Sequence, residues 1–114
     1  MARCVKPHLL LLSMLAVSIL AGGASADADP VTDFIIRADS LAQAGGDEAL
    51  TRYVVEKGIL VGAVVGQLLD VAYEIGESGE KAAEEENVAF AERVATLYAE
   101  NGGTQAPLEQ ARTY

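Results

Sequence analysis

The reactive side chains of this sequence are mainly carboxylates, and the run Glu84-Glu85-Glu86 is their densest group. Carboxylates can bind a metal ion or act as general acid and base. Consecutive residues of a helix point to different sides, so these three glutamates cannot converge on one ion. No D-x-D-x-D-G calcium loop occurs in the sequence. The run is typical of a solvated helix face, and we expect neither a metal nor another cofactor.

A second pair of carboxylates, Asp70 and Glu74, lies one helical turn apart. Such a pair could serve as acid and base, because it borders the most apolar stretch of the chain and Asp70 could be partly buried near Arg52 or Lys57. A surface-facing pair explains the spacing as well. Since no other catalytic group accompanies these residues, we predict that the protein is not an enzyme.

Residues 1–26 have the features of a signal peptide. Arg3 and Lys6 precede a long apolar run, and Ala24-Ser25-Ala26 provides a small-residue cleavage site. We therefore expect cleavage after Ala26 and export of the mature chain to the periplasm or the cell exterior. The alternative is an uncleaved N-terminal anchor, because the apolar run is barely shorter than a membrane span.

The mature chain, residues 27–114, would contain no Cys, His, Met or Trp. This excludes Ser-His-Asp and Cys-His nucleophile pairs, and any His or Cys site for zinc, copper or haem. It also excludes a disulfide framework, although an exported protein could form one. One small domain held together by its apolar core is the expected organisation.

The mature chain is strongly acidic. Removing Arg3 and Lys6 leaves six Lys and Arg against 17 Asp and Glu, a formal net charge of −11. This balance disfavours nucleic acid and anionic lipid surfaces as partners, since phosphate binding relies on clustered basic residues. It is compatible with a cationic partner, and it also serves to keep a helical protein soluble.

The apolar spacing predicts an all-α fold, a small antiparallel bundle of about four helices. Pro30 lies at a helix start, whereas Gly45-Gly46 and Gly102-Gly103 are typical of helix ends. We expect a helical domain over residues 27–101 and a flexible or incomplete tail over 102–114. The expected helices are residues 30–44, 47–57, 59–76 and 80–101.

The stretch GILVGAVVGQLLDVAYEIG, residues 58–76, allows three interpretations. Glycines four apart are typical of close helix contacts in membranes, but the continuous apolar part is too short to cross a bilayer. A β-hairpin with the preceding RYVV would stand alone in a helical chain. We favour a buried central helix. The apolar side that could remain open to a protein partner comprises Gly58, Gly62, Val65, Gly66, Leu69 and Tyr73.

The segment Leu68–Ala91 resembles one unit of a tetratricopeptide-like repeat. Leu68, Val71-Ala72 and Ile75 match the first helix of that family, and Gly79 lies where its turn glycine belongs. Val94-Ala95, Tyr98 and Gly102 resemble the opening of a further unit, which extends the match over about residues 68–110. The resemblance implies stacked helical pairs that form a binding scaffold.

These observations favour an exported, non-catalytic helical module that binds a protein or peptide, including a second copy of itself. The alternative is an acidic periplasmic factor, chaperone-like or stress-related, that holds a cationic client. Neither nucleic acid nor, after signal cleavage, a membrane is an expected partner.

Overall fold

The computed structural model describes residues 29–114, so the predicted signal peptide lies outside the described residues. This part of the chain is helical and contains no strand, which confirms the all-α prediction and rules out the hairpin pairing of RYVV. The elements are α2 (Pro30–Gln43), α3 (Asp47–Glu56), the 3₁₀ turn η2 (Gly58–Leu60), α4 (Val61–Glu77), α5 (Lys81–Glu100) and α6 (Ala106–Arg112).

Helices α2 and α3 form the first hairpin, with ends close to those that the sequence predicts. Asp29 caps α2, because its Oδ2 accepts the backbone N–H of Thr32 at 3.2 Å, and Pro30 opens the helix. Gly45 ends it at a φ of 82°, a left-handed conformation that favours glycine. The buried side chains of the two helices include Phe34, Ile35, Leu50 and Val54.

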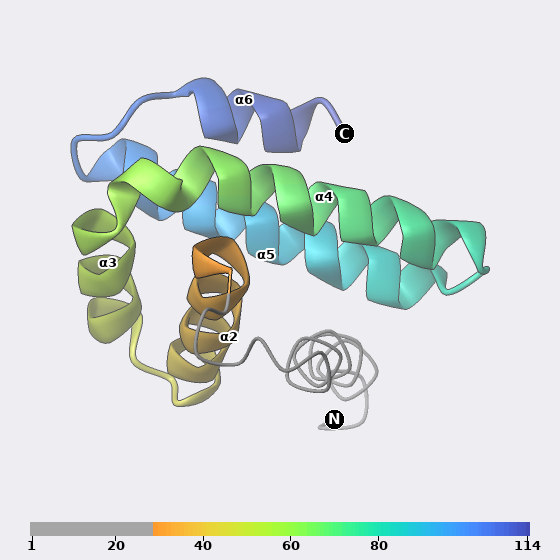
Figure 1. The fold of residues 1–114 in the computed structure, drawn as a ribbon, viewed down its shortest axis with the longest axis horizontal. Coiled ribbons are helices and arrows are strands. Elements are labelled where there is room, and N and C mark those ends of the chain that lie inside the picture. The colour runs from red at the N-terminus through yellow and green to blue at the C-terminus, as the bar shows by residue number, and fades with distance from the viewer. Residues whose placement is uncertain (1–28) are drawn as a thin grey trace.

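Helices α4 and α5 form a longer antiparallel hairpin, which is the centre of the molecule (Figure 1). The turn between them is fixed by Gly79, whose φ is 92°. The backbone N–H of Glu80 donates to the carbonyl of Ile75 at 3.3 Å, a bond that closes the end of α4.

The other helices cover this central hairpin from two sides (Figure 1). Helix α6 lies along one side, whereas α2 and α3 cover the other and run across its direction. The arrangement differs from the predicted bundle of about four antiparallel helices, because the short first hairpin crosses the long second one and a fifth α-helix follows.

The C-terminal segment is where the prediction was wrong. Residues 102–114 were expected to be flexible or incomplete, but residues 106–112 form α6. A seven-residue helix is marginal in water, so its stability must come from tertiary packing. Pro107, Leu108 and Ala111 are buried and supply that packing. The helical domain therefore extends beyond residue 101.

Helix α4 supplies more buried residues than any other described helix, as expected of a buried central helix. The seven buried residues of this helix are Val61, Val64, Val65, Leu68, Leu69, Ala72 and Ile75. By length and composition the segment Gly58–Glu77, with a mean hydropathy of 1.5, could also span a membrane. Core helices of soluble proteins share these features, and 39% of the segment is buried inside the protein.

Candidate functional site

The most distinctive surface of the molecule is the groove between α4 and α5 on which α6 lies. We call it the α6 groove and define it by Val65, Gly66 and Leu69 of α4 together with Ala91 and Ala95 of α5. Val65 and Leu69 share a side of α4, and Gly66 lies beside them. A Cβ built on Gly66 would lie 3.5 Å from Nε2 of Gln110, so the end of this α6 side chain reaches the glycine.

Helix α6 fills the groove with its apolar side. Leu108 is 6% exposed and Ala111 3% exposed, and both belong to the same buried cluster as Val65 and Leu69. The opposite side of α6, with Glu109, Gln110 and Arg112, is exposed. The groove thus holds a short amphipathic helix whose residues three apart face inward.

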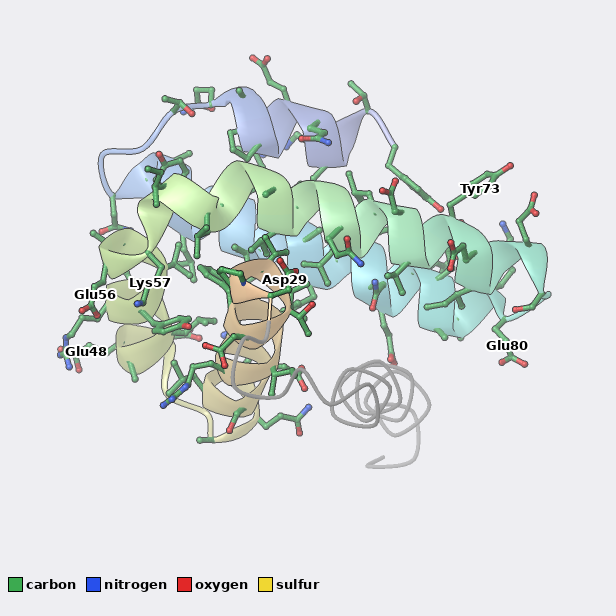
Figure 2. The ribbon with its side chains drawn as sticks, in the orientation of Figure 1. Asp29, Glu48, Glu56, Lys57, Tyr73 and Glu80 are labelled. Atoms are coloured by element: carbon green, nitrogen blue, oxygen red, sulfur yellow. The ribbon has the colours of Figure 1, made fainter. Side chains whose placement is uncertain are left out.

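The predicted partner-binding residues have different surroundings. Val65 and Leu69 are buried, Gly66 is half-buried next to α6, and Gly62 is exposed with open space around its Cα. Tyr73 is 59% exposed and projects outward from α4 (Figure 2). The structure therefore brings Val65, Gly66 and Leu69 together under α6, but the face is not open along its whole length.

Gly58 does not belong to the helical face on which the sequence places it. It lies in η2, before α4 begins at Val61. A Cβ on Gly58 would lie 2.7 Å from Cε1 of Tyr98, and one on Gly103 would lie 2.5 Å from the same ring. Two glycines distant in sequence therefore enclose the Tyr98 ring at the point where the chain leaves α5 for α6.

Polar contacts hold the far end of α6. The Tyr114 hydroxyl donates to Oε2 of Glu84 at 2.5 Å, and this hydrogen bond raises the pKa of Tyr114 to about 12. Arg112 Nε lies 3.4 Å from Oε2 of Glu92. These contacts are exposed, so each contributes little to stability and weakens with salt.

The three consecutive glutamates face different surroundings. Glu84 is half-buried against Gly76 and lies 3.6 Å from Nζ of Lys81, whereas Glu85 is exposed and Glu86 faces α2. Within residues 29–114, no group of three or more His, Cys, Asp or Glu side chains could hold a metal ion.

The other carboxylate pair does not form a buried site. Asp70 and Glu74 are both exposed. Of the two alternatives that the sequence left open, the structure shows the surface-facing pair, because Asp70 lies on the side of α4 that faces away from Val65 and Leu69. Tyr73 is exposed, whereas Tyr53 and Tyr98 are half-buried.

A second hollow lies between α2 and α5, on the side away from α6. It has a volume of about 440 Å³. Asp39, Glu86 and Phe90 line it. Arg93 also lines it and pairs with Asp47. Sequence reasoning missed this hollow, because its residues come from two helices whose crossing the helical spacing does not specify.

Asn87 is a polar residue of α5 that is fully buried. Its Nδ2 donates to the backbone carbonyl of Leu68 at 2.8 Å, which joins α5 to α4. Its Oδ1 has no hydrogen-bond partner among the described residues. The interface between the two central helices thus contains one polar bond and one buried acceptor that lacks a partner.

Comparisons with protein-family models, curated proteins and solved structures found no match to this chain. The resemblance to tetratricopeptide-like repeats consequently stays a prediction.

Proposed function

We propose that the protein is a non-catalytic interaction module that binds a short amphipathic helix of a protein partner in the α6 groove. The observation that carries this proposal is α6 itself: a seven-residue helix with inward-facing Leu108 and Ala111 occupies the groove. A surface that holds one such helix within the chain has the shape and the apolar character to hold another from outside.

Two further features support this proposal. The segment Leu68–Ala91, which resembles a tetratricopeptide-like unit, coincides with parts of α4 and α5, the helices that form the groove. The predicted signal peptide would bring the module to the periplasm or the cell exterior, where its partner would be a protein or peptide.

Helix α6 would compete with the partner for the groove. A short flexible linker gives a tethered segment an effective concentration on the order of millimolar. A free helix at micromolar concentration would therefore bind poorly until α6 is displaced. Weakening the contacts of α6 should expose the groove without altering its lining.

The test uses the full chain and a fluorescein-labelled peptide of residues 101–114. Leu108→Glu should unseat α6, because it buries a charge, and fluorescence anisotropy should show peptide binding at least about tenfold tighter than to the unsubstituted chain. Ala111→Glu provides a second variant with the same expected effect, and circular dichroism checks that the other helices remain folded.

A matched pair of substitutions locates the binding site. Gly66→Leu, added to Leu108→Glu, should block the peptide, since position 66 faces the path of α6. Gln67→Leu adds the same side chain at an exposed neighbouring position and should leave binding unchanged. Failure of the peptide to bind either folded α6 variant, or equal blocking by both leucines, would contradict the proposal.

A second candidate function follows from the hollow between α2 and α5. The carboxylate of Glu86 in its lining suits a lysine or arginine side chain of a cationic client, as the acidic composition also suggests. Glu86→Gln should then weaken binding of a lysine-rich amphipathic peptide at low salt, whereas Glu85→Gln on the exposed side should not. Equal effects of the two substitutions would indicate attraction by net charge alone.

A further inference from the structure

The segment that carries α6 is built to leave its groove as a unit. Isolated helices of seven residues are not stable in water, so residues 102–114 hold their helix only while it is seated. The linker from Asn101 to Gln105 is exposed except at Gly103, which is half-buried. Gly102 has a φ of 102°, and the N–H of Gly103 donates to the carbonyl of Tyr98 at 2.8 Å.

The groove, in turn, requires a helix. Val65 and Leu69 are 0% and 7% exposed in the folded chain, and removal of α6 would uncover the side of α4 on which they lie. Exposed apolar surface of this kind favours association. A molecule whose α6 has left would therefore carry both an empty groove and a free α6. Its groove could bind the α6 of a second such molecule, and its α6 could bind the groove of that second molecule.

Every contact of α6 can be made equally well by the same helix of another copy. Leu108 and Ala111 would enter the same apolar surface, Tyr114 would reach Glu84, and Arg112 would reach Glu92. The monomer and the exchanged dimer differ in the path of the linker. They also differ in the translational and rotational entropy that two chains lose when they associate. Exchange of an identical terminal element is a low-cost route to a dimer.

We propose that the partner of the α6 groove is a second copy of this chain, and that two chains exchange α6 reciprocally through the Asn101–Gln105 hinge. This inference rests on the proposed function, since it names the partner of the same groove. The linker length sets the balance between the monomer and the exchanged dimer. A linker that lets α6 reach the groove of its own chain favours the monomer at low protein concentration. The fraction of exchanged dimer increases with protein concentration.

The first experiment shortens the hinge in the full chain by deleting Gly102 and Gly103. The shortened linker cannot return α6 to its own groove, so light scattering after size exclusion should show at least about a tenfold higher dimer fraction than for the unaltered chain. Adding Leu108→Glu should restore the monomer. A monomeric deletion variant, or a dimer that survives Leu108→Glu, would overturn the exchange.

A cysteine pair identifies which chain supplies the helix. In a Cys4→Ser background, hinge-shortened chains with Gly66→Cys are mixed with hinge-shortened chains with Gln110→Cys and oxidised. If α6 is exchanged, the yield of interchain disulfide should be at least about tenfold higher than in a control mixture that carries Gln67→Cys in place of Gly66→Cys. Equal yields from the two mixtures would overturn the exchange and indicate random collision.

The outcomes separate this inference from the function on which it rests. If the labelled peptide binds Leu108→Glu but the shortened chain stays monomeric, the groove accepts helices and its partner is a different protein. If the peptide fails to bind and no exchanged dimer forms, both proposals are wrong.

Discussion

The two sides of the α4–α5 hairpin are covered in different ways. On one side, α2 and α3 contribute large side chains, among them Phe34, Leu50 and Val54. On the other side, the seven-residue α6 contributes Pro107, Leu108 and Ala111. The first covering has enough buried apolar area to form part of the stable core, whereas the second depends on a few contacts at the end of a glycine linker. The difference explains why we place the exchangeable interaction site under α6.

The largest effect should come from the α2–α3 side. Leu50→Ala removes a side chain that is 0% exposed and should lower the free energy of unfolding by about 3 kcal/mol, because it leaves a cavity in the core. Urea denaturation followed by circular dichroism measures the loss. Ile59→Ala, at a residue that is 95% exposed, is the control and should leave stability unchanged.

Leu108→Ala should have a smaller and local effect. The cost is limited to the free energy that docks α6, since the helix can leave while the other helices remain folded. We expect a loss of about 1–2 kcal/mol, with hydrogen exchange accelerated in residues 106–112 and little changed in α3. Equal acceleration throughout the chain would show that α6 belongs to the same cooperative unit as the α2–α3 hairpin.

Asn87→Leu, at the interface between α4 and α5, should raise the stability of the protein. The substitution removes the buried Oδ1 that lacks a partner, and it also removes the bond to the carbonyl of Leu68. That carbonyl lies within α4, where the helical hydrogen bonds continue, so we expect a gain of about 1 kcal/mol. Thermal unfolding measures this change. A loss of stability would mean that the bond between α4 and α5 outweighs the cost of the unpaired oxygen.

Two glycines on the α6 side should respond in opposite directions. The Cβ of Gly58→Ala would press on the Tyr98 ring, and Gly103 in the linker also lies against this ring. The substitution should therefore destabilise the protein by about 1 kcal/mol. Gly62→Ala meets open space in a helix and should stabilise it by about 0.5–1 kcal/mol. Parallel thermal melts compare them, and a shift of the same sign for both would contradict the assigned packing of Tyr98.

The smallest expected effect concerns the hydroxyl of Tyr114. Its pKa is raised to about 12, above its ordinary value of 10, so the folded state favours the protonated phenol that donates to Glu84. The contribution of this bond is complete below pH 10 and disappears as the pH rises through 12. Burial also raises the pKa of Tyr53, so the Tyr114 titration is identified by difference. Absorbance titration near 295 nm should lose one late-titrating phenol in Tyr114→Phe, and an unchanged late titration would contradict the assignment to Tyr114.

The sequence alone determined the elements that rest on local signals. Asp29-Pro30 sets the start of α2, and Gly45 and Gly79 end helices because each has a positive φ that glycine adopts without strain. The apolar stretch of residues 58–76 identified α4 as a buried central helix.

Only the tertiary structure decided what lies against each face. The segment after Gly103 is too short to be helical by itself, and its burial depends on the groove between α4 and α5, which the sequence around it does not display. The sequence likewise groups Gly58 with Gly62 and Gly66, but the contact of Gly58 is with Tyr98, forty residues later in the chain. Helical periodicity specifies which residues turn inward, whereas the helix that covers them depends on the path of the whole chain.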